Sequence, residues 1–243
     1  ARQVGRTFML LRSYPEAEYY FEQAILLAPD VPLAYDFKAR IYVLAEGSTE
    51  KARSSLKDAL QNIKPAENAT IVNSLVDIDI YDANYQEALD QLSLVSEDID
   101  DQFNFIPNSL RYAEIYGYMD ENELAKKYYD EARNILKAKI QQEPNDARFH
   151  SALGIAYAGL GRKEDAIREG KLAMELLPVA KEAWRGLSKV EALAKIYVMV
   201  GESDAAIDQL EFLLSVPGEL SIPLLRLDPA WDSLRNHPRF KKL

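Results

Sequence analysis

A few residues of this chain are of types that carry out chemistry, and their spacing decides whether they could act together. His150 and His237 are the only two histidines, and they lie far apart with no cysteine in the chain. A bound metal ion needs several Cys, His or carboxylate ligands at suitable spacing, and a nucleophile needs a base beside it. Neither arrangement is present in the sequence. The sequence therefore predicts no catalytic residue, no metal site and no cofactor.

The glycines near the middle of the chain resemble a phosphate-binding loop only superficially. Gly154 and Gly159 have the Gly-x4-Gly spacing, but a P-loop requires Lys directly after the second Gly, and Leu160 stands there. The pattern around them is also helical, whereas a P-loop follows a strand. We interpret these glycines as positions of close packing and turns.

Charge excludes further classes of function. The formal net charge of the 243 residues is −10, and nucleic-acid binding needs a clustered excess of Lys and Arg. The longest uncharged stretch, 149–161, is shorter than the roughly 20 apolar residues that span a bilayer. The acidic clusters lack the glycine and glutamate of a calcium-binding loop. We expect a non-enzymatic protein that neither binds nucleic acid nor inserts into a membrane.

A repeated pattern indicates which elements position these residues. An alanine recurs with a large residue four positions later in most units, and the successive alanines are 35, 36, 37, 41 and 40 residues apart. The marker alanines are Ala17, Ala52, Ala88, Ala125, Ala166 and Ala206. Apolar residues recur at helical spacing before and after each one. Each unit is predicted to be two amphipathic helices joined by a short turn.

These residues resemble the tetratricopeptide repeat family. The fifth unit matches its pattern best, through the following residues in the family's order: Leu153, Gly154, Tyr157, Gly161, Ala166, Ala173 and Pro178. The third unit matches least well, because Asp79 stands where an aromatic residue is expected. The resemblance implies an all-α, right-handed α-solenoid of about six tetratricopeptide helix pairs with a short helical C-terminal cap, which binds proteins without catalysis.

The predicted domains follow from the repeat. The array spans 1–217, and residues 218–243 form a capping segment expected to fold back on the sixth unit. The approximate units are 1–30, 31–65, 66–102, 103–145, 146–180 and 181–217. The second helix of the fourth unit should run about two turns further than its counterparts and project beyond them, because 134–142 lacks Gly and Pro.

The end of the chain carries a second resemblance. The run 224–240 is similar to the C-termini of bacterial tetratricopeptide regions that follow a Ser/Thr kinase, a nucleotide cyclase or a winged-helix output domain. This implies the regulatory region of a larger bacterial signalling protein in the cytoplasm, a compartment that fits the absence of cysteine. Because the chain starts at Ala1 without a signal-like segment, we expect a fragment or a processed product.

In such arrays the first helix of each unit lines a concave groove, and side chains four positions apart point the same way. Transferring that geometry gives the partner-binding candidates Arg2, Arg6, Asp36, Phe37, Arg40, Asn73, Asp77, Leu110, Glu114, Ser151, Ile155, Glu191 and Lys195. The first of these reproduce only part of the carboxylate clamp that some family members use.

The expected ligand is a protein or peptide segment, including one from the parent protein. The alternative is self-association into a homo-oligomer through the exposed first unit or the long helix of the fourth unit.

Overall fold

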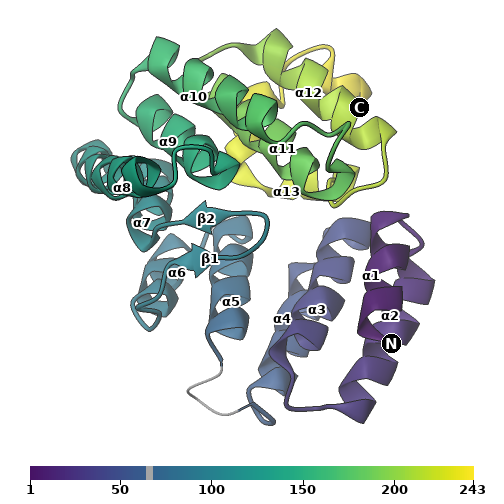
Figure 1. The fold of residues 1–243 in the computed structure, drawn as a ribbon. Helices are drawn as coiled ribbons and strands as arrows, with labels where there is room; N and C mark the ends of the chain where they lie inside the picture. The colour runs from purple at the N-terminus through teal and green to yellow at the C-terminus, as the bar shows by residue number, and fades with distance from the viewer. Residues whose placement is uncertain (64–67) are drawn as a thin grey trace. The chain divides into compact units, whose positions relative to one another are not determined.

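The computed structural model describes residues 1–63 and 68–243, and these form six consecutive helix pairs (Figure 1). The first three pairs are α1 (Arg2–Leu10) with α2 (Tyr14–Leu27), α3 (Pro32–Glu46) with α4 (Thr49–Ala59), and α5 (Ala69–Tyr81) with α6 (Tyr85–Leu92). The next three are α7 (Asn108–Tyr118) with α8 (Asn122–Gln142), α9 (Ala147–Gly159) with α10 (Lys163–Leu176), and α11 (Ala183–Met199) with α12 (Ser203–Ser215). The predicted fold class, an all-α solenoid of helix pairs, is confirmed.

One turn is repeated in every pair. A residue with positive φ stands two positions before the second helix each time, which reverses the chain direction within a few residues. These residues are Arg12, Gly47, Ala83, Asp120, Gly161 and Gly201, with φ between 57° and 79°. Three of them are not glycine, and each bears the cost of the left-handed conformation, about 1 kcal/mol.

The marker alanines all occupy the same kind of environment. Ala17 and Ala166 are fully buried, as are Ala52, Ala88 and Ala206, and Ala125 is 5% exposed. Gly154 explains why small residues recur here, since a Cβ on it would lie 3.0 Å from the backbone oxygen of Ala166 on α10. The two helices could not approach so closely with a larger side chain. The close packing expected of the glycine is confirmed, and the buried alanines lie at equivalent packed positions.

Contacts divide the chain into two compact units. Unit 1 comprises 1–95 and 216–229, and unit 2 comprises 96–215 and 230–243. In unit 1 one apolar cluster, between α3, α4 and α5, includes Leu56 and Ile71, and another, between α1, α2 and α3, includes Phe21 and Phe37. Neighbouring pairs of unit 1 therefore bury their apolar faces against one another.

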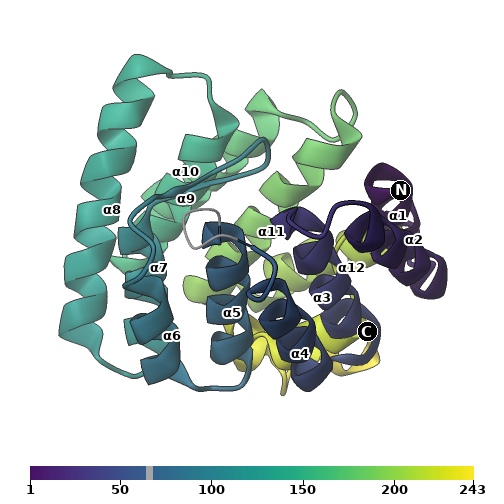
Figure 2. The same cartoon turned by 90° about the horizontal axis from the view of Figure 1, so that it is seen from below.

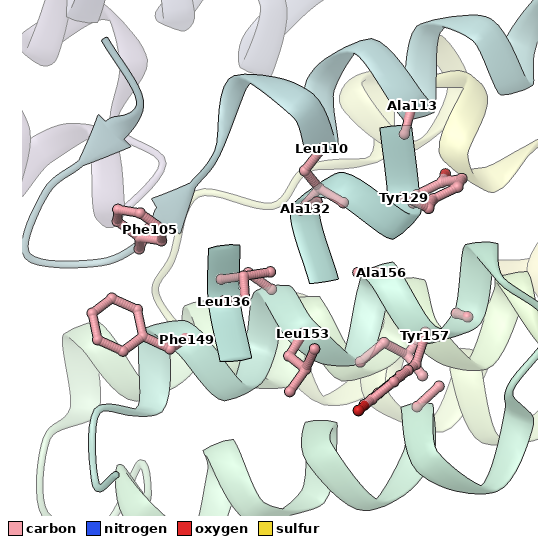
Figure 3. Packing of buried hydrophobic residues seen from close by; sticks show 14 of the residues in the cluster. Phe105, Leu110, Ala113, Tyr129, Ala132, Leu136, Phe149, Leu153, Ala156 and Tyr157 are labelled. Atoms are coloured by element: carbon pink, nitrogen blue, oxygen red, sulfur yellow. The ribbon is translucent and has the colours of Figure 1, made fainter. Parts of the chain in front are cut away.

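The main cluster of unit 2 joins α7, α8, α9 and a small hairpin. Figure 3 shows Phe105 of the hairpin facing Phe149 of α9, with ring centres 5.1 Å apart. The hairpin pairs β1 (Ile99–Asp100) with β2 (Phe105–Ile106) in antiparallel register. The sequence analysis did not predict these two short strands, because two residues are too few to show an alternating pattern.

The long second helix of the fourth pair is confirmed, since α8 has 21 residues (Figure 2). The expectation was that the extension projects beyond its neighbours, but part of it packs against them. Leu136 is fully buried, and the Lys139 Nζ lies 4.8 Å from the centre of the Phe105 ring. The extra turns pack on the hairpin and on α9, which covers the apolar side of the extension.

The sequence analysis expected residues 218–243 to fold back on the sixth pair. This is wrong for some of them. Leu224 and Leu227, from α13 (Ile222–Leu227), pack on the clusters of unit 1. Residues 230–243 belong to unit 2, where Trp231 is fully buried and Arg239 pairs with three carboxylates of α12. Two short 3-10 helices, η2 (Pro229–Leu234) and η3 (Phe240–Lys242), complete the chain. The C-terminal residues 216–243 are thus divided between the two units.

Candidate functional site

The C-terminal segment 216–229, here called the tail segment, lies against the first helix of unit 1. The Gly218 amide donates a hydrogen bond of 2.9 Å to the Leu10 carbonyl, at the end of α1. Arg12, in the turn after α1, donates from Nη2 to the Leu220 carbonyl at 3.3 Å. Both bonds use main-chain atoms of the tail segment, which bends at 216–219, so they do not depend on its side chains.

A carboxylate of the tail segment lies between two arginines. Glu219 is 3.0 Å from the Nη1 of Arg40 on α3 and 3.9 Å from the Nη2 of Arg6 on α1. The Arg6 guanidinium also stacks over the Phe37 ring, 5.1 Å from its centre, and Phe37 in turn stacks on Phe21 at 5.4 Å. The buried rings therefore fix one of the two cations at the place where a carboxylate binds.

The electrostatics of α3 reflect this contact. Glu219 is the main reason that the pKa of Arg40 is raised; burial opposes it, and Asp36 and Asp77 add to the rise. Burial raises the pKa of the Asp36 carboxyl, while Arg40 and a 2.6 Å hydrogen bond from the Ser74 hydroxyl act against that rise. Arg40 is thus surrounded by carboxylates of its own helix and of α5, and the tail segment adds the carboxylate of Glu219.

An apolar contact follows a few residues later. The Ser221 hydroxyl accepts a hydrogen bond from the Leu224 amide and so begins α13. Leu224 then reaches both apolar clusters of unit 1. Pro223 lies beside Gly47, where a Cβ would be 3.6 Å from the proline Cβ. The tail segment is therefore recognised by main-chain bonds, by one carboxylate and by apolar side chains in succession.

The structure brings together only part of the predicted partner-binding set. Arg6, Phe37 and Arg40 meet at Glu219, and Asp36 lies beside them. Arg2 is half-buried one turn before Arg6 on α1. On α5, Asn73 is half-buried and Asp77 is exposed.

The predicted positions in unit 2 are less accessible. Leu110 is 1% exposed in the main cluster, and buried Ser151 donates its hydroxyl to the Ala147 carbonyl at 2.9 Å. Neither offers a side chain to a partner, because both point into packed interior. Ile155 packs against the same cluster and Glu114 is half-buried. Glu191 and Lys195 lie 3.9 Å apart on α11.

Four residues of the site were not anticipated from the sequence: Arg12, Gly218, Glu219 and Leu220. Arg12 was missed because it lies in a turn, outside the first helix of the repeat pattern. The pair Pro217-Gly218 did indicate the end of a helix. Such a local signal does not reveal which distant helix the following residues will contact.

Unit 2 contains a second polar region that we considered as a site. An open cavity of about 640 Å³ lies at the start of α9, and Asp146, Arg148 and Arg185 are among its lining residues. Arg148 pairs with Asp146 at 2.6 Å and with Asp100 at 2.7 Å. Its charge is already matched by carboxylates of its own unit, so the cavity offers little to an added anion.

Lys189, on α11 in the same unit, is 1% exposed and donates to the Phe103 carbonyl at 2.5 Å. Burial lowers the pKa of its ammonium group to about 8. The Phe103 ring packs on Trp184 of α11, with ring centres 5.4 Å apart. Lys189 thus fastens the hairpin loop to α11, which is a structural role.

The two histidines of the chain have different surroundings. His150 Nδ1 is 2.7 Å from a Glu169 oxygen and its Nε2 is 2.9 Å from the Pro144 carbonyl. Both partners are acceptors, so both ring nitrogens must donate, and the pKa of His150 is raised chiefly by Glu169. His237 lies in a turn, 3.8 Å from Asp204. Within the described ranges, no group of three or more His, Cys, Asp or Glu side chains could hold a metal ion.

Comparison with solved structures places the fold. PilW, a type IV pilus biogenesis factor, matches with a TM-score of 0.50 and 21% identity over 93% of this chain and 95% of that chain. The likeness shows the fold. Lower scores are found for a tetratricopeptide repeat protein from Parabacteroides merdae (TM-score 0.43, 17% identity, 92% of this chain and 80% of that chain). A TPR2AB domain of yeast Sti1 in complex with pHSP90 also matches (TM-score 0.31, 17% identity, 99% of this chain and 96% of that chain).

No protein-family model matches the sequence, and no curated protein matches it either. None of the helices in the described residues is both long and apolar enough to cross a membrane.

Proposed function

We propose that this chain is a non-catalytic, protein- or peptide-binding scaffold, and that its binding site is the surface of α1 and α3 formed by Arg6, Arg12, Phe37 and Arg40. The observation that supports this is the tail segment itself, which lies on that surface as a bound peptide would. Binding needs a main-chain anchor, a charge match and an apolar contact, and the surface supplies all three.

We further propose that the chain is the regulatory region of a larger bacterial signalling protein and acts in the cytoplasm. This rests on the resemblance of residues 224–240 to the ends of repeat regions that follow a kinase, cyclase or winged-helix domain. A scaffold of this kind would regulate its output domain through the partner segment that it holds.

A peptide selection tests the proposed function. Random 16-residue peptides displayed on phage are selected on the immobilised full chain, and their affinities are measured again on an Arg40→Glu variant. The selected peptides should bind the variant at least roughly fivefold more weakly, because a charge-assisted bond is replaced by repulsion. The matched control is Arg235→Glu in unit 2, whose side chain is 41% exposed against 47% for Arg40. Peptides that bind all three proteins equally would contradict the proposal.

Self-association is a second candidate, favoured by the exposed apolar side chains of the first pair. Leu26 and Leu27 at the end of α2 are 75% and 81% exposed, and Tyr19, Leu11 and Val4 are each more than 40% exposed. Such side chains are characteristic of protein contact surfaces. Light scattering over a concentration series tests this candidate. Oligomers that disappear in a Leu27→Asp variant would support it, and a monomer at high concentration would contradict it.

A further inference from the structure

The ion pairs that hold the tail segment are of a kind that can exchange, whereas Leu220 and Leu225 are buried and supply its apolar hold. The Glu219 side chain is 27% exposed and that of Arg40 is 47% exposed, so water competes for this ion pair. The arginines reach the tail segment through long side chains, and its Gly218 amide makes one bond to α1. The helix α13 has six residues, too few to persist without a surface to pack on. The tail segment thus has few local reasons to keep its conformation once it leaves α1 and α3.

We infer that the tail segment is an internal ligand of this surface, and that an acidic-apolar segment of a partner protein binds by displacing it. This inference rests on the proposed function and specifies its ligand. The recognised chemistry is a carboxylate side chain at a bend of the polypeptide, followed about five residues later by a leucine-like side chain, as Glu219 is followed by Leu224.

Each part of this chemistry corresponds to a contact. The carboxylate faces Arg6 and Arg40, and the carbonyl of the next residue accepts the Arg12 hydrogen bond. The leucine fills the junction of the two apolar clusters of unit 1, as Leu224 does. A basic side chain in the carboxylate position would meet two guanidinium groups, so the surface discriminates against basic segments by repulsion as well as by lost contacts.

The inference has a regulatory consequence. An internal ligand competes at a high effective concentration because it is covalently attached, so a free partner binds only the fraction of molecules whose site is open. A change that weakens the tail segment without touching the surface should therefore tighten the binding of an external segment. A change that damages the surface should weaken that binding even though it also releases the tail segment. These opposite outcomes separate an internal ligand from a purely structural cap.

The experiment uses a fluorescent synthetic peptide of residues 214–229 and measures its anisotropy with the full chain. The Glu219→Lys protein should bind the peptide roughly fivefold more tightly than the wild type, since its own tail segment is repelled by Arg6 and Arg40. The control Glu22→Lys makes the same charge change at a residue that pairs with Lys38 instead of with the tail segment, and should bind like the wild type. The Arg40→Glu protein should bind the peptide weakly.

A charge-swapped peptide makes the test specific. A 214–229 peptide with Lys in place of Glu219 should bind the Arg40→Glu protein more tightly than the wild-type peptide does. Equal affinity of the wild-type and Glu219→Lys proteins, with loss on Arg40→Glu, would overturn the internal ligand and leave the proposed function standing. If neither peptide binds any of the proteins, the inference also fails, and the phage selection decides the proposed function independently.

Discussion

Unit 1 and unit 2 are built from the same helix pairs but use their polar side chains differently. In unit 2 two polar side chains are buried and satisfied: Lys189 by the Phe103 carbonyl and His150 by Glu169. In unit 1 the ion pair of Glu219 with Arg40 is open to water. A buried, satisfied polar group fixes a structure, whereas a half-exposed one can change partners at little cost. The ion pair of Glu219 is the contact at which we propose exchange.

The largest expected effect is a loss of stability that differs between the tail segment and the residues that follow it. Trp231→Ala removes a fully buried ring in unit 2 and should lower the free energy of unfolding by about 3 to 5 kcal/mol. Leu224→Ala removes a half-buried side chain in unit 1 and should cost about 1 kcal/mol. Urea titrations followed by circular dichroism measure both. Equal losses would mean that the tail segment is as integral to the fold as η2.

The next effect concerns the buried imidazole of unit 2. His150→Gln should cost about 1.5 to 3 kcal/mol at pH 6, because hydrogen bonds to a charged group are lost. Glu169 raises the pKa of His150, so this stabilisation is fully present below the unfolded-state pKa of about 6.5 and is lost as pH rises through the higher folded-state pKa.

Unfolding titrations of both proteins from pH 5.5 to 8.5 test this sign. The difference in the free energy of unfolding between the wild type and His150→Gln should decrease with increasing pH. A difference that increases would show that the neutral ring is the stabilised form, which contradicts the assignment of both ring nitrogens as donors.

The contribution of Lys189 to stability should change with pH in the opposite direction to that of His150. Burial lowers the pKa of Lys189 to about 8, so between pH 8 and its unfolded-state pKa of about 10.4 the unfolded chain binds more protons. Stability from this group therefore rises with pH over that range. Lys189→Met should change the free energy of unfolding by less than about 1 kcal/mol at pH 7 and remove the rise. Urea titrations at pH 7 and 9.5 measure it; a rise that persists in the variant would assign it to another group.

The smallest effect on stability is expected at the contact that we propose for binding. Glu219→Lys should lower the free energy of unfolding by at most about 1 kcal/mol, because the ion pairs it breaks are half-exposed. The same urea titration measures it beside Glu22→Lys as the control. A loss as large as that of Trp231→Ala would mean that the tail segment is a structural cap and would remove the contrast between the units.

The sequence predicted the helix pairs because their signal is periodic and local. Ala17 and Ala166 mark the same packed position in different pairs, and such repetition is visible without coordinates. The turns were only partly predictable from the sequence. Gly161 is a residue type that favours the left-handed conformation, whereas Ala83 adopts the same conformation although alanine does not favour it. There the demands of the pair override the preference of the residue.

The candidate site was half predictable for a similar reason. Arg6, Phe37 and Arg40 follow from helix geometry, because residues on one face of the first helices share a surface. Glu219 could not be assigned to them, since it lies more than one hundred residues away in sequence and no local pattern encodes that pairing. The burial of Leu110 and Ser151 likewise depends on what packs over them.

The central claim is that the tail segment leaves α1 and α3 while unit 1 stays folded, and amide hydrogen exchange tests it most directly. The Gly218 amide, bonded to the Leu10 carbonyl, should exchange through an opening of much lower free energy than the amides of Leu44 and Ile71 in the same unit. Glu219→Lys should speed exchange at Gly218 and leave the other two unchanged. Exchange of Gly218 at the same free energy as Leu44 and Ile71, in both proteins, would contradict the account.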